Sequence, residues 1–155
     1  MSDTLDELYR DIVMDHFKYP RGRKNIEHPD VTSEGQNPVC GDEIHVSLKI
    51  NDGMIEDIGV DCAGCAISVA SGSMLADVIK GKTLPEVKKI AATIKALLKG
   101  EKRPYPIELG DLEALAGVRK FPVRVKCALL AWTTLIDSIE ILEQGEKKEK
   151  VSTTE

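Results

Sequence analysis

An alternating apolar segment followed by a tight turn is the feature that most constrains the fold of this chain. Apolar and polar residues alternate over 44–50, which is the pattern of a strand with one buried face. The turn at 51–53 (Asn-Asp-Gly) contains residue types that tolerate positive φ, and the chain then returns through Ile58 and Val60. The sequence therefore predicts an antiparallel hairpin, and residues 30–34 are a weaker candidate for a third strand.

Helical spacing of apolar residues dominates the rest of the chain. The resulting prediction is an α+β fold, in which a small antiparallel sheet of about three strands packs against several helices. A short helical piece is expected at 112–115, inside an irregular, proline-containing stretch from 101 to 120. The longer helices are predicted at 5–17, 66–79, 84–98 and 123 to about 142.

Length and charge limit the domain count and the partners. The 155 residues suffice for one domain with a hydrophobic core, which we place at 1–142, and the charged tail at 143–155 is expected to be disordered. The net charge of −5 argues against a nucleic-acid partner. We find no secretory signal and no run of about 18 apolar residues, so we predict a cytoplasmic protein without a membrane span. In a reducing compartment, four cysteines favour metal binding or catalysis over disulfides.

Three cysteines far apart in the sequence each occupy a position that favours a thiolate. Cys40 lies in a loop beside the predicted hairpin, two residues before Asp42, and the glycine between them lets both turn toward one point. Cys65 lies where a strand gives way to a helix, whose free N–H groups favour negative charge. Cys127 lies roughly 140° from the core stripe of its helix, so it faces a second interface or a site. Three sulfurs and one carboxylate would suit zinc or one edge of an iron–sulfur cluster.

Other interpretations of these cysteines are open at this point. Each of the three could be a structural cysteine beside a turn or at a tight junction. Cys62 and Cys65 form a C-x-x-C motif, which alone indicates half of a zinc site, a redox pair or a chance spacing. A thioredoxin-like pair fits poorly, because such motifs accompany a βαβ pattern and here a hairpin comes first. A site of four cysteines, with Cys62 in place of Asp42, is a further alternative.

Three segments taken together resemble the U-type family of iron–sulfur cluster assembly, to which IscU and the N-terminal part of NifU belong. The segments are 37–42 (Asn-Pro-Val-Cys-Gly-Asp), 64–71 (Gly-Cys-Ala-Ile-Ser-Val-Ala-Ser) and 121–132 (Phe-Pro-Val-Arg-Val-Lys-Cys-Ala-Leu-Leu-Ala-Trp), and 8–17 is similar to that family's first helix. The resemblance covers nearly the whole chain except the tail. It implies a SufE/NifU-like α+β fold with the cysteines, and hence the metal site, gathered at one end.

Two features are similar to the SufU branch of this family, which binds zinc and relays sulfur. Lys126 precedes the last cysteine, where the scaffold branch carries a histidine, and an extra segment covers about 100–119. Cys62 departs from the pattern of either branch. The zinc ligands that the resemblance implies are Cys40, Asp42, Cys65 and Cys127.

The same resemblance implies a zinc-dependent sulfurtransferase that accepts persulfide sulfur from a SufS-type cysteine desulfurase, a pyridoxal-phosphate enzyme. It would be a sulfur acceptor rather than an independent catalyst, and would serve downstream iron–sulfur assembly proteins. On docking, a desulfurase histidine takes one zinc position and frees Cys40, whose thiolate attacks the outer persulfide sulfur. Arg124, beside the site, is an accessory candidate. The alternatives are a scaffold for a [2Fe–2S] cluster and a zinc-stabilised interaction domain that moves no sulfur.

Overall fold

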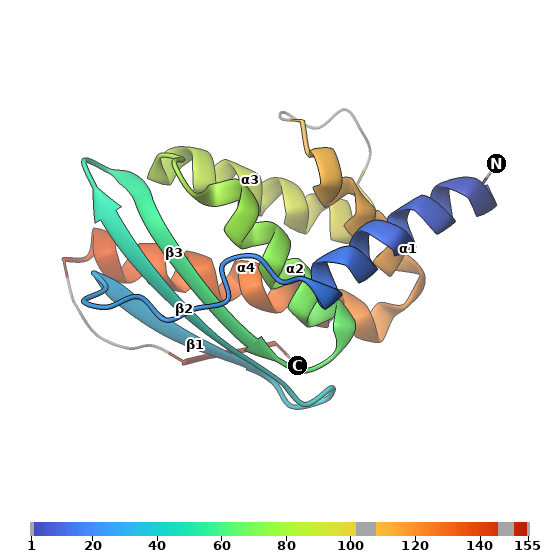
Figure 1. Cartoon of the computed structure of the whole chain (residues 1–155), viewed down its shortest axis with the longest axis horizontal. Helices are drawn as coiled ribbons and strands as arrows, with labels where there is room; N and C mark the ends of the chain where they lie inside the picture. The colour runs from blue at the N-terminus through green and yellow to red at the C-terminus, as the bar shows by residue number, and fades with distance from the viewer. Residues whose placement is uncertain (1, 102–107, 146–150, 155) are drawn as a thin grey trace.

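Helices cover one face of a four-stranded sheet in this chain (Figure 1). The structure is a computed structural model that describes residues 2–101, 108–145 and 151–154. Its elements, in chain order, are α1 (Ser2–Lys18), β1 (Val31–Asn37), β2 (Asp42–Asn51), β3 (Met54–Ala63), α2 (Ala66–Ile79), α3 (Leu84–Leu98), the 3-10 helix η1 (Gly110–Lys120), α4 (Pro122–Glu143) and β4 (Val151–Thr153).

The sheet has the strand order β3-β2-β1-β4. β2 pairs antiparallel with β3, so the predicted hairpin is confirmed. At its turn Asp52 and Gly53 have φ of 52° and 73°, the left-handed values that these residue types tolerate. The weakly indicated third strand is confirmed as β1. It continues beyond the predicted end to Asn37, because it pairs antiparallel with β2 until Asn37 lies opposite Asp42.

Two helices form the layer next to the sheet. α2 contacts β3, and α4 contacts β1 and β2. Val46 and Leu48 are fully buried, as the alternation in β2 predicts. Ser47 on the opposite face is buried as well, because the segment after α1 covers it and Ile26 N–H donates to its hydroxyl at 3.3 Å. α3 and η1 pack against the other side of α4, while α1 packs against α2 and η1. Because α4 is enclosed on two sides, it carries buried residues on more than one face.

The predicted long helices are confirmed as α1 to α4, with small differences at their ends. α3 shows why such ends can be predicted. Thr83 Oγ1 accepts the N–H of Glu86 at 3.3 Å, and Glu86 Oε1 accepts the N–H of Thr83 at 3.0 Å, which together make a capping box.

The stretch before α4 is more helical than predicted. The short piece expected at 112–115 is part of η1, which has 11 residues. Leu112 and Leu115 of η1 are buried, so packing against neighbouring helices stabilises a segment whose own helical signal is short. The prolines that suggested an irregular stretch, Pro104 and Pro106, fall within 102–107 and lie outside the described residues.

Part of the tail differs from the expectation of disorder. β4 pairs parallel with β1, and the N–H of Thr154 donates to the Gln36 carbonyl at 3.0 Å. Without this pairing, that edge of β1 would present free backbone groups, and pairing with the tail satisfies some of them. The prediction of a disordered tail is therefore corrected for residues 151–154.

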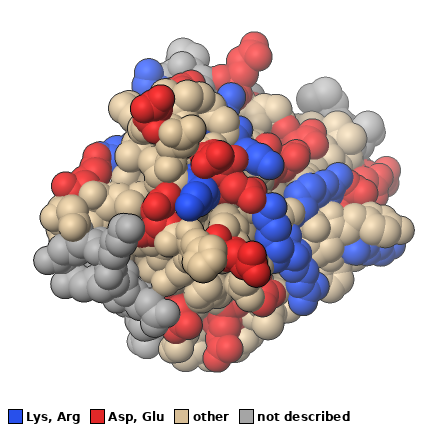
Figure 2. Space-filling view, turned by 60° about the vertical axis from the view of Figure 1, so that its left-hand side comes forward, with Lys and Arg blue, Asp and Glu red and all other residues tan. Residues whose placement is uncertain are grey.

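The surface mixes charges of both signs. On the face drawn in Figure 2, Lys and Arg side chains lie among Asp and Glu side chains. Basic residues of the segment after α1 are also paired, as in Arg21–Asp15 at 2.8 Å and Lys24–Asp57 at 2.9 Å. Within the described part of the chain, no helix combines the length and the apolar character needed to cross a membrane.

Candidate metal centre

Three ends of secondary structure meet at one end of the molecule: the turn between β1 and β2, the junction of β3 with α2, and the first turns of α4 (Figure 1). Potential ligand atoms of Cys40, Asp42 and Cys127 all lie within 4.8 Å of one another. The thiol of Cys65 lies 3.8 Å from Asp42 Oδ2. The structure therefore brings together the four residues that the sequence analysis named as ligands.

Asp42 links the parts of this cluster. It is the first residue of β2 and is 1% exposed. Its Oδ1 accepts the backbone N–H of Cys65 at 2.8 Å, so the start of α2 fixes the carboxylate. Its Oδ2 faces the thiol of Cys65 at 3.8 Å and the side-chain amide of Asn37 at 3.5 Å. A carboxylate this buried needs such partners, and they hold it beside the sulfurs.

Cys65 is the N-cap residue of α2, as its position between strand and helix predicted. Its Sγ accepts the N–H of Ser68 at 3.5 Å. The start of α2 therefore presents the Cys65 sulfur to the cluster.

Cys127 lies on the face of α4 that packs against β1. Leu130 and Thr134 belong to the same face and are fully buried. A Cβ placed on Gly35 of β1 would lie 2.1 Å from Thr134 Oγ1 and 3.0 Å from Leu130 Cδ1, so helix and strand are in close contact. The sequence analysis left open whether this face of α4 meets a second packing interface or a site. The structure shows a packing interface with β1, and Cys127 lies where that interface reaches the cluster.

The surroundings of Cys127 favour the neutral thiol in the absence of a cation. The residue is fully buried, and burial raises the pKa of its thiol well above the ordinary value. The neighbouring side chains of Cys40, Asp42 and Cys65 raise that pKa further. A metal ion binds the thiolate, and its charge would compensate for this environment.

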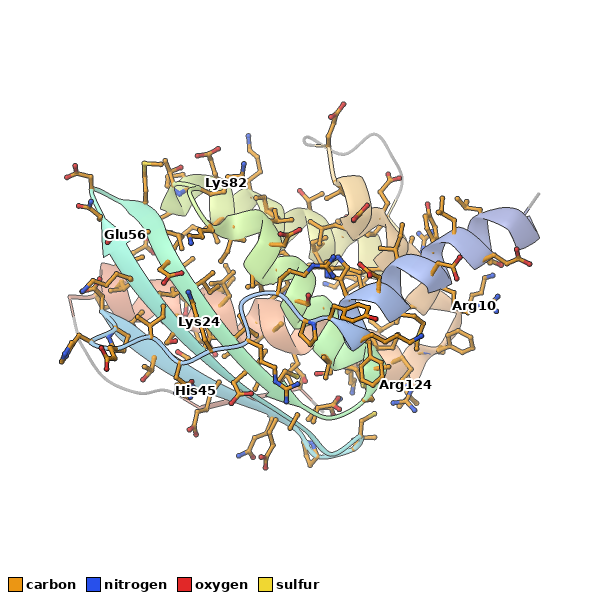
Figure 3. All side chains as sticks on the ribbon, in the orientation of Figure 1. Arg10, Lys24, His45, Glu56, Lys82 and Arg124 are labelled. Atoms are coloured by element: carbon orange, nitrogen blue, oxygen red, sulfur yellow. The ribbon has the colours of Figure 1, made fainter. Side chains whose placement is uncertain are left out.

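Cys40 belongs to the turn between β1 and β2 and is only partly buried. The next residue, Gly41, has φ of 72°, a value that glycine adopts without strain. Arg124 Nη1 lies 3.6 Å from Cys40 Sγ, and Figure 3 shows Arg124 at the end of the molecule where α2 begins. Contact with Cys127, and then the charges of Cys65 and Cys40, raise the pKa of Arg124. The guanidinium of Arg124 therefore stays positively charged beside the thiols.

Cys62 lies outside the cluster. It is a buried residue of β3, opposite Ile44, and its sulfur lies 3.2 Å from Ser68 Oγ. Burial raises the pKa of Cys62 to about 11. The structure places Asp42, not Cys62, beside Cys40 and Cys127, so the alternative of a four-cysteine site does not describe this arrangement.

Two residues that the sequence analysis did not single out shape the site. Gly64 has φ of 153°, and a Cβ there would lie 2.2 Å from Asp42 Oδ1, so glycine makes room for the carboxylate. Asn37 is fully buried, and its Nδ2 lies 3.4 Å from Cys127 Sγ. Both belong to the segments around Cys40 and Cys65, which is the signal that could have indicated them.

The donor set suits a tetrahedral zinc ion. Sulfurs that bind one zinc at about 2.3 Å lie about 3.8 Å apart. The ligand atoms of Cys40, Asp42 and Cys127 lie at most 4.8 Å apart, so these three residues need only a small contraction around one ion. Cys65 Sγ lies beside them, 3.8 Å from Asp42 Oδ2. The same donors also suit one edge of an iron–sulfur cluster.

The fold and this group of thiols around a carboxylate agree with the family that the sequence resembles. Residues 8–128 match the NifU-like N terminal domain, and the chain belongs to that family. The expected NifU-like α+β fold is confirmed with it.

Its relatives carry two kinds of name. The chain is 39% identical over 147 residues, 95% of each chain, to the zinc-dependent sulfurtransferase SufU of Bacillus subtilis. It is also 39% identical over 136 residues, 88% of this chain and 85% of the relative, to the iron–sulfur cluster assembly scaffold protein IscU of Streptococcus pyogenes. A solved structure from Fervidobacterium islandicum, described as a candidate iron–sulfur cluster assembly scaffold for the SUF system, gives a TM-score of 0.78 at 31% identity, over 83% of this chain and 93% of that one.

Proposed function

We propose that this protein is a zinc-dependent sulfurtransferase of iron–sulfur cluster biogenesis, which accepts sulfur from the persulfide of a SufS-type cysteine desulfurase. The observation that carries the proposal is the grouping of Cys40, Asp42 and Cys127, with Cys65 beside Asp42, at one end of the fold. The name of the Bacillus subtilis relative supports it. The four free cysteines suit a reducing compartment, so we infer that the protein works in the cytoplasm.

In this proposal Cys40, Asp42, Cys65 and Cys127 are the zinc ligands. A bound zinc ion would keep the sulfurs deprotonated and would hold together the three chain ends that supply them. The convergence of those ends from distant parts of the sequence supports this assignment.

Cys40 is the proposed sulfur acceptor. It lies on a turn, and its neighbour Val39 is 65% exposed, whereas Cys127 is fully buried. The Cys40 thiolate would attack the outer sulfur of the desulfurase persulfide. The sulfur–sulfur bond breaks, its electron pair leaves with the desulfurase thiolate, and Cys40 carries the new persulfide without any oxidant. Downstream assembly proteins could reach the sulfur on the same turn.

Arg124 is the proposed accessory residue. Its guanidinium lies 3.6 Å from Cys40 Sγ and is exposed, so its charge is available both to the thiolate and to a docking partner. An arginine in this position would attract the negatively charged groups that approach the acceptor sulfur.

The test combines metal content with desulfurase activity. We expect about one zinc ion per purified chain and a large stimulation of alanine production by a SufS-type desulfurase. The stimulation should be lost in Cys40→Ala and kept in Cys62→Ala, because Cys62 lies outside the cluster. Absence of stimulation by the wild-type protein would contradict the proposal.

A [2Fe–2S] scaffold is the second candidate, because relatives such as that of Streptococcus pyogenes carry the scaffold name. The same four residues would then ligate the cluster. A cluster that stays bound after anaerobic loading with iron and sulfide, together with no stimulation of the desulfurase, would favour this function over the first.

A further inference from the structure

Asn37 has a buried side-chain amide whose nitrogen has hydrogen-bond partners and whose oxygen has none among the described residues. It is the last residue of β1, is fully buried, and lies opposite Asp42 in the register of the sheet. Its Oδ1 is also buried and accepts no hydrogen bond from the described residues. A buried polar atom without a partner costs free energy, so the stability of the fold alone does not explain an asparagine here.

The other end of the amide faces the metal centre. Asn37 Nδ2 lies 3.5 Å from Asp42 Oδ2 and 3.4 Å from Cys127 Sγ, which offers one N–H to each. The opposite orientation would set the amide oxygen against a carboxylate and a sulfur, both of which accept hydrogen bonds when a cation is bound. The amide therefore has one sensible orientation, with its donors toward the site.

These contacts join two parts of the chain that carry ligands. Asp42 begins β2, and Cys127 belongs to α4, so Asn37 connects sheet and helix at the level of the site. The Val123 carbonyl lies 3.8 Å from the Cys127 sulfur. Only a thiol can donate to that carbonyl, whereas a thiolate needs donors such as the Asn37 amide.

We propose that Asn37 is a positioning residue of the metal centre, whose amide orients Asp42 and Cys127 for zinc binding. This inference rests on the zinc site of the proposed function. Ligands bound to a metal still accept hydrogen bonds, and donors behind them fix their direction and raise affinity. Arg124 supplies charge from the exposed side of the site, while Asn37 supplies donors from the interior.

Asn37→Leu tests the proposal, because leucine is close in size but has no donor and no polar oxygen. Two quantities are measured on the full chain: zinc affinity, by competition with a chromophoric chelator, and urea unfolding of the metal-free protein. We expect zinc affinity to fall about 10–100-fold. The metal-free protein should lose little stability, because Asp42 loses one donor but keeps the Cys65 N–H, while the unpartnered Asn37 oxygen is gone. Gln36→Leu, at the neighbouring exposed position, is the control and should leave zinc affinity unchanged.

Three results would overturn the inference. The first is unchanged zinc affinity in Asn37→Leu. The second is a parallel loss of stability in the metal-free protein, and the third is failure of both Asn37→Leu and Asn37→Ala to fold. Either of the last two would make Asn37 a structural residue. Equal zinc affinities of wild type and Asn37→Leu contradict this inference alone. A wild-type protein that binds zinc but does not stimulate the desulfurase contradicts the proposed function alone.

Discussion

Gly64 shows how little room single residues have at the metal centre. Its φ of 153° is rare for other residues, and a Cβ would lie 2.2 Å from Asp42 Oδ1. The carboxylate oxygen in question accepts the N–H of Cys65 at 2.8 Å. A side chain at position 64 would therefore disturb the backbone and the contact between two proposed ligands together.

Gly64→Ala should lower zinc affinity by about tenfold and destabilise the metal-free protein by about 1–3 kcal/mol. The matched control is Gly53→Ala in the turn between β2 and β3. Gly53 also has positive φ, 73°, but a Cβ there would meet no atom within 4 Å. The Gly53→Ala variant should lose stability and keep its zinc affinity. Chelator competition on both variants checks this, and equal zinc affinities would contradict it.

Cys62 is expected to affect stability at high pH rather than metal binding. Its pKa is raised from 9.0 to about 11 in the folded protein by burial. The folded state therefore holds this proton more tightly than the unfolded state does. The resulting stabilisation is complete below about pH 9 and is lost as pH rises through about 11.

Urea unfolding of the metal-free protein at several pH values tests this. The difference in unfolding free energy between wild type and Cys62→Ala should shrink from pH 9 to pH 11, because alanine does not titrate. Subtracting the variant removes the contribution of other groups that titrate in this range. A difference that does not change with pH would show that the Cys62 thiol does not behave in this way.

Among the elements, those with a local signal could be predicted from the sequence. The turn with Asp52 and Gly53 fixed the β2–β3 hairpin, and Thr83 marked the start of α3. Cys65 at the start of α2 could be placed for the same reason, since a strand-to-helix junction is a local pattern.

Contacts between distant elements could not be predicted from residue patterns. The length of η1 depends on packing against α1, α3 and α4, and β4 depends on the edge that β1 leaves open. The contact of Asn37 with Cys127 depends on the pairing of β1 with β2 and on the approach of α4, which no local pattern specifies. The grouping of the ligands entered the sequence analysis through resemblance to a family, because spacing alone left several ligand sets open.

Removal of β4 tests whether the tail protects β1. In a chain that ends at Gly145, the backbone amides of Glu34 and Gln36 should exchange hydrogen faster, since the backbone groups of alternate β1 residues face β4 and lose that neighbour. Backbone amides that pair β2 with β3 serve as the internal control and should keep their protection from exchange. Hydrogen exchange followed by NMR distinguishes the two sets. Unchanged exchange at Glu34 and Gln36 would mean that β4 does not hold this edge in solution.

The end of the molecule that carries the thiols also carries an apolar surface. The end with the thiols carries exposed apolar side chains, Phe121 at 59% and Val123 at 57%, on either side of Pro122 and close in sequence to Arg124. His45, which bonds to Asn25 at 3.2 Å, lies on the sheet well away from Arg124 (Figure 3). Exposed apolar groups close in sequence to Arg124 are suited to contact with the desulfurase of the proposed function.

Phe121→Ser should weaken stimulation of the desulfurase without loss of zinc. Serine is well tolerated before a helix, so α4 is not expected to suffer. We expect the protein concentration for half-maximal stimulation to rise about tenfold, because a buried aromatic contact would be lost. Met54→Ser is the control, since Met54 is 41% exposed and lies at the other end of the β2–β3 hairpin. An equal effect of both variants would argue against docking at the thiol end.

The claim that Cys40 receives the sulfur is tested most directly by following isotopically labelled sulfur. A desulfurase charged with labelled cysteine is mixed with the zinc-bound protein, and persulfides are alkylated and mapped by mass spectrometry. We predict label on Cys40 in the wild type and in Cys62→Ala, and none on Cys40→Ala. Label on Cys65 or Cys127, or none on this protein while the desulfurase is charged, would contradict the claim.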